Sequence, residues 1–486
     1  MLRAKVKDCM YIVSALLLML NSRVAFADIS DSVARKSCEN LDLPILYITT
    51  KDSTMPTYEV AYPPDGSIGV GINNLDTLPA RMWVVQFGDT IYDSGEYVKD
   101  TSGLTIRVRG NTSVVEGNEK KPYKLNLQRK ADIMFRGNDA IYADKDWILI
   151  KDIYNNIGGH MLNRALNMLW TPAFLPVFLF LNGNFRGEYL LMENVKRDKN
   201  CRVNVSKDGF IFEFDPYYWN EEYYITSNFE YCNYTLKYPK SKNLLIDQDI
   251  YLSDCLAQLE EAYSDPNSLV SMVDIQSYAR FLWLHDILGT YDVGGSNMFF
   301  CKYDTTENSK IQMICGWDFD SSFALSELTK WSRLHSYWWY DLFFNLPQIP
   351  FVRSYIDMYD TLVNNSIDIV AAQIDSLREC PYMLQLDSAQ KLDNMRWNTR
   401  VSADIRIKYI ADYLRVKKTH IAGLMDELKE EYSLWLNTNN ECNCVGKQIV
   451  AIYDIMGRKI NDNNFRGMVI IVYDDGSACK TYRKIW

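Results

Sequence analysis

The hydrophobic pattern of this chain changes its period partway along, and that change limits the folds open to it. Over residues 41–110, short β-like runs alternate with turn clusters such as 63–66. From residue 247 onward the period becomes helical, and a long proline-free stretch covers 388–433. The pattern predicts an α+β protein whose strands come first, with helices behind them. Expected strands are 45–48, 82–86, 104–108, 122–127, 174–181 and 188–192, and expected helices are 159–169, 247–263, 273–288 and 367–377.

The order of elements between residues 122 and 192 is that of a small nucleotide-binding lobe. A strand (122–127) precedes a helix (159–169), and two further strands follow, joined at the turn Asn182-Gly183. After residue 436 short strands return at 448–453 and 468–473, which predicts a separate small β-module.

The first 27 residues have the features of a secretory signal peptide: a basic start, an apolar run at 11–20 and a cleavage-like Ala25-Phe26-Ala27. The apolar run is too short to span a bilayer, so a membrane anchor is disfavoured. Cleavage removes four of the 52 basic and one of the 62 acidic residues, which shifts the formal net charge from −10 to −13. So acidic a chain is a poor nucleic-acid binder, and we expect no nucleic-acid partner. We expect export, to the medium, the cell surface or the periplasm.

Cysteine usage leaves two possibilities open. Of eleven cysteines, all but Cys9 lie beyond the signal peptide, an even number compatible with disulfides in an oxidising compartment. Cys301 and Cys315 flank an expected hairpin and could lie nearly opposite each other, and buried free thiols are the alternative. Cys442-Asn443-Cys444 is too sparse for a zinc site, and the four histidines lack ligand-like spacing, so a His-bound metal is not expected.

Two segments carry candidate phosphate-binding residues. The loop Arg109-Gly110-Asn111-Thr112-Ser113 follows a strand, so its backbone amides could close over an anion, although an ordinary β-turn explains it equally. Lys124 in PYKLNL points to the face opposite its neighbours Tyr123 and Leu125, as a phosphate-binding lysine on a lobe strand should. Lys120 and Lys121 are rivals, and a solvated edge-strand charge is the alternative.

The strongest local constellation is an aspartate, an asparagine five positions later and a further aspartate downstream. These are Asp292, Asn297 and Asp318, with Asp320 as a second carboxylate, in the order that kinase-like sites use. Asp292 would orient and deprotonate a hydroxyl, while Asn297 and Asp318 would hold a metal ion. Hard oxygen ligands suit Mg²⁺ or Mn²⁺. The alternative is that Asp292 caps a turn and that Asp318 and Asp320 are surface turn residues.

Six segments in order along the chain resemble the CotH kinase family, named for a spore-coat kinase and widespread in secreted bacterial proteins. Together they span roughly residues 100–330, and the helical remainder to about 435 fits the family's helical lobe. The segments are IRVRGNTS (106–113), KKPYKLNLQRK (120–130), DWILIKD (146–152), LNGNFRGEYLLMENV (181–195), LKYP (236–239) and GWDFDSSFA (316–324).

The resemblance implies a divergent protein-kinase-like fold of two lobes, β-rich then helical, that uses ATP and Mg²⁺ or Mn²⁺ to phosphorylate protein hydroxyls. Asp292 and Lys124 would be catalytic, and Glu193 would fall near the nucleotide hinge. The other cofactor-binding residues would be Arg109, Gly110, Asn111, Ser113 and Lys121, and the metal ligands Asn297, Asp318 and Asp320.

The chain departs from the family pattern at three places. Ile157-Gly158 replaces a common Arg-Asn, Ala324 replaces a frequent glycine, and the catalytic loop is glycine-rich. An inactive relative that binds glycan or protein at the surface is therefore an alternative, and transfer of a nucleotidyl or glutamyl group is another.

The tail segments VAIYDIMGRKI (450–460) and FRGMVIIVYDDG (465–476) resemble C-terminal sorting modules of proteins exported by type IX secretion in Bacteroidetes. The resemblance implies a possible contact with outer-membrane secretion machinery, and a generic β-hairpin is the alternative. We therefore divide the chain into a signal peptide (1–27), a β-rich segment (28–100), a CotH-like kinase domain (101–435) and a C-terminal β-module (445–486).

Overall fold

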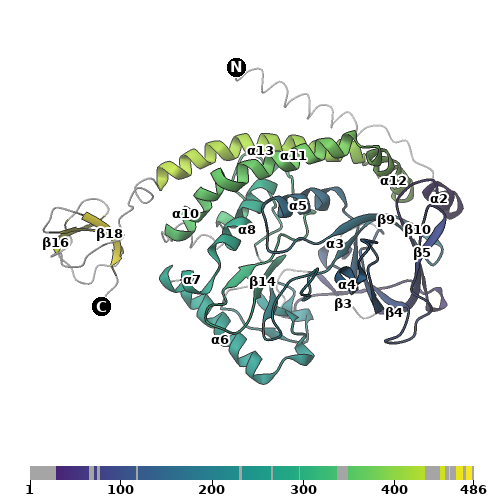
Figure 1. The fold of residues 1–486 in the computed structure, drawn as a ribbon, viewed down its shortest axis with the longest axis horizontal. Coiled ribbons are helices and arrows are strands. Elements are labelled where there is room, and N and C mark those ends of the chain that lie inside the picture. The colour runs from purple at the N-terminus through teal and green to yellow at the C-terminus, as the bar shows by residue number, and fades with distance from the viewer. Residues whose placement is uncertain are drawn as a thin grey trace, which may run out of the picture.

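The computed structural model has a mixed α+β fold, as predicted (Figure 1). The residues it describes are 29–64, 70–73, 77–115, 119–228, 232–263, 266–294, 296–336, 349–432, 449–454, 459, 467–473 and 478–483. The predicted signal peptide and Cys442-Asn443-Cys444 lie outside these residues. The arrangement in two lobes stays a prediction.

Strands of the first sheet close into a barrel. Their order is β1-β9-β10-β8-β7-β6-β4, and β4 pairs back with β1, while β5 adds to the outside of β4. The segment 28–100 is thus built into the same sheet as the strands that follow it. The bounds are β1 Ile45–Thr50, β4 Leu78–Gln86, β5 Asp89–Asp93, β6 Leu104–Val108, β7 Tyr123–Ala131, β8 Asp144–Ile150, β9 Phe174–Leu181 and β10 Asn184–Glu193.

The barrel is apolar inside, and part of its outer surface is apolar too. Leu179 and Leu181 of β9 join the interior cluster, whereas Phe178 and Phe180 face outward into the second core with the helices. Burial on both faces explains why β9 reads as an unbroken apolar run. In β7, by contrast, Leu125 points inward and Lys124 outward at intermediate exposure, as predicted.

A second sheet stands beside the barrel with the order β12-β13-β11-β14-β15. Its strands are held by aromatic packing, as in the stacked rings of Phe212 and Phe300, whose centroids lie 5.4 Å apart. The bounds are β11 Phe210–Asp215, β12 Tyr224–Ile225, β13 Asn233–Tyr238, β14 Met298–Lys302 and β15 Ile311–Met313.

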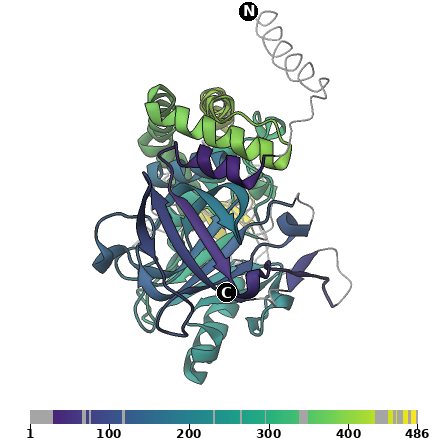
Figure 2. The same cartoon turned by 90° about the vertical axis from the view of Figure 1, so that its right-hand side faces the viewer.

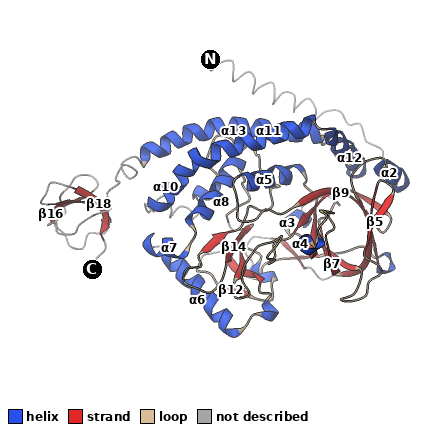
Figure 3. Ribbon diagram, viewed as in Figure 1, coloured by secondary structure: helices blue, strands red, loops and turns tan. Residues whose placement is uncertain are grey.

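Helices α11, α12 and α13 lie along one side of both sheets, as the green segments of Figure 2 show, whereas Figure 3 draws α6 and α7 on the other side of the second sheet. The predicted stretch 388–433 is divided between α12 and α13, because Asn398 adopts a left-handed φ of 51° that ends α12. The bounds are α5 Tyr154–Ala165, α6 Ile246–Ala262, α7 Pro266–Met272, α8 Ile275–Leu288, α10 Ile349–Met358, α11 Asn364–Glu379, α12 Pro381–Trp397 and α13 Ala403–Glu431.

Shorter elements complete the described chain. Three antiparallel strands form the predicted C-terminal β-module, which Figure 1 draws beyond the end of α13. Among the described helices none is both long enough and apolar enough to cross a bilayer. The elements are α2 Asp31–Cys38, β2 Glu59–Ala61, β3 Gly71–Asn73, α3 Thr112–Val115, α4 Asp139–Tyr142, β16 Ile449–Asp454, β17 Gly467–Tyr473 and β18 Ala478–Arg483.

The cysteines with described side chains are free thiols in this structure. Cys301 lies in β14 and Cys315 just after β15, and both are buried without a bond between them. Burial raises the pKa of Cys301 to about 12, which keeps it protonated and unreactive at neutral pH.

A buried polar cluster joins the barrel to α12. Asp393 of α12 accepts hydrogen bonds from Lys120 Nζ at 2.7 Å and from the backbone N–H of Glu188 at 2.9 Å. Tyr154 donates its hydroxyl to Glu188 Oε2 at 3.2 Å, and the Glu188 side chain is fully buried. Burial and the Asp393 carboxylate raise the pKa of Glu188 to about 8. The carboxyl is therefore neutral inside the fold at pH 7.

We predict that Glu188→Gln flattens the pH dependence of stability. Between its ordinary pKa and about 8, the native state keeps a proton that the unfolded state has lost, so the wild type loses stability as pH rises. Denaturant unfolding at pH 5 and pH 8.5 should show a smaller loss in the variant, by on the order of 3 kcal/mol. Equal losses in both proteins would contradict the assignment, and Glu261→Gln on the exposed face of α6 is the control.

Candidate active site

The loop after α8 carries Asp292 and is fixed to the loop after β15. Gly289 ends α8 with a left-handed φ of 57°. Thr290 and Ser322 share a hydroxyl hydrogen bond at 3.0 Å, and the backbone N–H of Asp292 donates to Ser321 Oγ at 3.1 Å. The Asp292 side chain itself is exposed, so a substrate hydroxyl can reach it.

The β14–β15 hairpin brings Asn297 and Asp318 to the same end of the second sheet. Asn297 directly precedes β14, and Asp318 follows β15 after four connecting residues. The backbone N–H of Ile314 donates to the carbonyl of Phe299 at 2.9 Å, which extends the pairing toward the site. Both residues have positive φ, 60° for Asn297 and 57° for Asp318, a conformation that Asn and Asp tolerate better than most side chains.

Buried asparagines of helix α5 form hydrogen bonds with the loop that carries Asp318 and Asp320. Asn163 pairs with the backbone of Gly316 in both directions, at 2.9 and 3.0 Å. Asn156 Nδ2 donates to Asp320 Oδ1 at 2.9 Å, and Asn155 Nδ2 donates to the Asp320 carbonyl at 3.0 Å. Each buried amide thus has partners on the loop, which fixes the loop's position relative to the barrel.

The carboxylates of this region are close enough to disturb one another. Burial, Asp318 and Asp152 raise the pKa of Asp320 well above its usual range, and Asp318 and Asp320 are within hydrogen-bonding distance. Burial raises the pKa of Asp152 to about 6, with a further increase from Asp318 against the opposing charge of Arg406. Partial desolvation by the surrounding loops and the Asp318 charge raise the pKa of Asp292. This region therefore favours added positive charge.

Basic side chains from β6 and β7, and Arg109 after β6, lie near these carboxylates. Lys124 lies 4.0 Å from Asp146, and burial lowers its pKa to about 8, with Arg107 among the neighbours that lower it further. Arg107 and Lys124 are directly opposite each other across the β6–β7 pair. Burial lowers the pKa of Arg109, while the charges of Asp318, Asp320 and Glu213 act in the opposite direction. Arg109 thus lies between the carboxylates and the two basic strand residues.

The remaining predicted cofactor-binding residues, apart from Glu193, lie in the chain between β6 and β7. Gly110 has φ 100°, and the Asn111 carbonyl begins the short helix α3, which contains Ser113. Lys121 Nζ donates to the Val114 carbonyl at 2.7 Å and therefore braces that helix.

Glu193 occupies a separate buried ion cluster at the end of β10. Its Oε1 accepts from Arg136 at 2.7 Å and pairs with Arg202, while its Oε2 accepts from the backbone N–H of Ala173 at 3.0 Å. Its carboxylate is therefore committed to protein partners in this structure.

The oxygen donors fit a divalent cation of the Mg²⁺ kind. No group of three or more His, Cys, Asp and Glu side chains in the described part of the chain forms a metal site by itself. Mg²⁺ in phosphotransferases commonly takes only one or two carboxylates and completes its shell with water and phosphate oxygens. Asp318 and Asp320 supply such a pair, and the Asn297 amide donates through Nδ2 to the Asp292 carbonyl at 3.4 Å, which leaves its oxygen for a ligand.

Sequence reasoning missed three residues of this site. Asp152, Asn155 and Asn156 stand at the start of α5, before the predicted helical start at 159. Asp152 lay within a segment that resembles the CotH family, and two adjacent asparagines entering an apolar helix were the available signal. The contact with Asp320, some 165 residues away, had no signature in local pattern.

We predict that Gly159→Ala displaces the loop that carries Asp318 and Asp320. A Cβ on Gly159 would come within 2.2 Å of the Phe319 ring, between Asp318 and Asp320. Overpacking of this kind should lower the free energy of unfolding by about 1–3 kcal/mol and weaken Mn²⁺ binding. Gly423→Ala on α13, where nothing lies within 4 Å, is the matched control and should stabilise by about 1 kcal/mol. Equal effects of both changes would contradict the packing argument.

We predict that Asp318→Asn raises the melting temperature of the metal-free protein and abolishes stabilisation by Mn²⁺. The change removes the charge that raises the pKa of both Asp292 and Asp320, and Asn keeps the left-handed backbone. Thermal unfolding with and without millimolar Mn²⁺ measures both effects. Asp254→Asn, at an exposed position of α6, should behave as the wild type. A retained Mn²⁺ shift in Asp318→Asn would place the ion elsewhere.

Similarity to known proteins is found at the level of a family. A search among curated proteins found no match. A family model described as CotH kinase protein matches residues 106–440, about two thirds of the chain, from the strand before Arg109 through the whole of α13. The match spans the loop of Arg109, Lys124, the carboxylates and the helices that support them. The chain therefore belongs to the CotH kinase family.

Proposed function

We propose that this protein is an exported atypical protein kinase that transfers the γ-phosphate of ATP to protein hydroxyls. The observation that carries the proposal is the Asp318–Asp320 pair, because repulsion between the two carboxylates favours a bound divalent cation. The basic residues Arg107, Arg109 and Lys124 lie near this pair. A triphosphate with its metal ion is complementary to that combination of charges. Membership of the CotH kinase family supports the same reaction class.

Each residue has a part in the proposed reaction. Lys124 and Arg107 would bind phosphate oxygens, which would restore the full charge of the lysine whose pKa burial lowers to about 8. Asp318, Asp320 and the Asn297 oxygen would hold Mg²⁺ or Mn²⁺, which neutralises charge on the phosphates when bound. Asp292 would accept the proton of the acceptor hydroxyl, and its raised pKa makes it a better base than an ordinary aspartate.

Several features of the proposal rest on sequence resemblance. Export rests on residues 1–27, and contact with the secretion machinery rests on the tail resemblance at 450–476. The nearness of Glu193 to the nucleotide hinge likewise rests on the family pattern.

The test uses ATP labelled on either the α or the γ phosphate, with Mg²⁺ or Mn²⁺ and a generic protein acceptor. We expect label from the γ position to appear on protein and to fall by at least about 10³-fold in Asp292→Asn. Glu307→Gln, at an exposed position in the β14–β15 turn, should keep full activity. Label from the α position would indicate nucleotidyl transfer. Absence of label together with no ATP-induced thermal shift would favour an inactive binding protein.

A further inference from the structure

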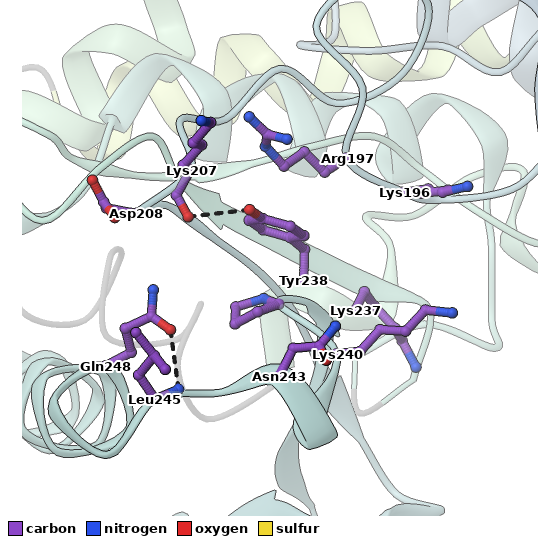
Figure 4. A pocket seen from close by; sticks show the side chains of 11 residues that line it. Lys196, Arg197, Lys207, Asp208, Lys237, Tyr238, Lys240, Asn243, Leu245 and Gln248 are labelled. Atoms are coloured by element: carbon purple, nitrogen blue, oxygen red, sulfur yellow. Dashed lines mark hydrogen bonds between the residues drawn. The ribbon is translucent and has the colours of Figure 1, made fainter.

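A basic pocket lies beside the proposed active site and has no role in the reaction described above. Its volume is about 510 Å³, within the range of small-molecule sites. Three segments line it: the residues after β10, the 207–208 loop, and the end of β13 with the chain that follows (Figure 4). Figure 4 shows their side chains arranged around Tyr238.

The charge of the lining is opposite to that of the chain. Five basic residues and one acidic residue line the pocket, in a protein whose formal net charge is −10. Clefts lined by one sign of charge concentrate ligands of the other sign. The basic residues are Lys196, Arg197, Lys207, Lys237 and Lys240, and the acidic one is Asp208.

Ion pairs within the protein account for only some of these cations. Lys196 pairs with Asp144 at 2.7 Å and with Asp146 at 2.8 Å, and Lys237 pairs with Glu213 at 2.8 Å. The ammonium groups of Lys207 and Lys240 have neither an ion pair nor a hydrogen bond with any described residue. Both side chains are exposed, so water solvates their charges in the free protein and both ammonium groups are accessible to an anion.

Contacts within the protein fix the backbone at Lys207 and the side chain of Arg197. The Tyr238 hydroxyl donates to the Lys207 carbonyl at 3.1 Å, which ties the 207–208 loop to β13. Arg197 Nε donates to the carbonyls of Val205 and Ser206 at 2.9 and 3.1 Å, and its guanidinium lies 5.0 Å from the Tyr238 ring centroid. The walls are thus set before any ligand arrives, which reduces the entropy lost on binding.

The lining does not include the residues proposed to hold the nucleotide and its metal ion. Arg109, Lys124, Asp318 and Asp320 are not among the eleven residues that line this pocket. Lysine and arginine at this density match phosphate oxygens.

We propose that this pocket binds a small phosphate-bearing ligand other than the nucleotide held at Asp318, and that Lys207 and Lys240 are its principal contacts. The inference does not require phosphoryl transfer. The pocket lies close to the proposed active site, because Lys240 is among the charged groups that lower the pKa of Lys124. Occupancy by an anion would therefore change the electrostatic environment of that lysine.

The test is calorimetric titration of the purified chain with pyrophosphate at low salt. We expect binding that weakens by roughly tenfold for each lysine lost in the Lys207→Gln/Lys240→Gln double variant. The matched control is Lys199→Gln/Lys242→Gln, which removes the same charge from nearby exposed positions outside the pocket lining and should bind within about twofold of the wild type. Thermal unfolding of each variant checks that it is folded.

A competition arm separates this pocket from the nucleotide site. We expect pyrophosphate still to bind when the chain is saturated with a non-hydrolysable ATP analogue and Mg²⁺, with an affinity lowered by repulsion between the two anions but not abolished. The proposal is overturned if pyrophosphate does not bind, if both double variants lose binding equally, or if the analogue displaces it. Failure of the proposed kinase activity would be seen only in the labelled-ATP experiment, so the two proposals can fail separately.

Discussion

The closed barrel, apolar inside and partly apolar outside, determines where polar chemistry can lie. Its interior is filled by side chains such as Leu125 and Leu179, and the outer face of β9 is buried under the helices through Phe178 and Phe180. The helices do not bury the outward-facing side chains of β6 and β7 in this way, and these include Arg107 and Lys124. Basic residues of the barrel therefore lie near the second sheet, where the charge of Glu213 acts on Arg109.

Like charges crowd at each end of the proposed site, although Asp146 lies 4.0 Å from Lys124. At one end Asp318 and Asp320 crowd together and favour a proton or a cation. At the other, burial and neighbouring cations lower the pKa of Lys124, which favours an anion. Crowding of like charges lowers the stability of a fold. It persists here because Asn156 and Asn163 of α5 hold the carboxylate loop by hydrogen bonds. The strain is the kind that a bound metal ion and polyanion would relieve.

Local pattern predicted the longer helices and six strands of the barrel, because burial alternates with period two in β7 and follows the helical period in α13. It did not predict that β1 closes the barrel, since its parallel pairing with β9 joins segments distant in sequence. Asn297 and Asp318 were predicted as site residues from their spacing. Asp152 and Asn156 were not, because only the packing of α5 against the loop after β15 brings them to Asp320.

The parallel pairing of β1 with β9 has a consequence for the limits of the domain. The region that matches the family begins at residue 106, inside β6, whereas the barrel needs β1 and β4 from before that point. A polypeptide cut at the family boundary would leave β6 and β9 as open edges rich in apolar side chains, which favours aggregation. The region that matches the family and the region that must fold together are thus different stretches of this chain. During synthesis, the barrel cannot close until β10 has followed β9 out of the ribosome.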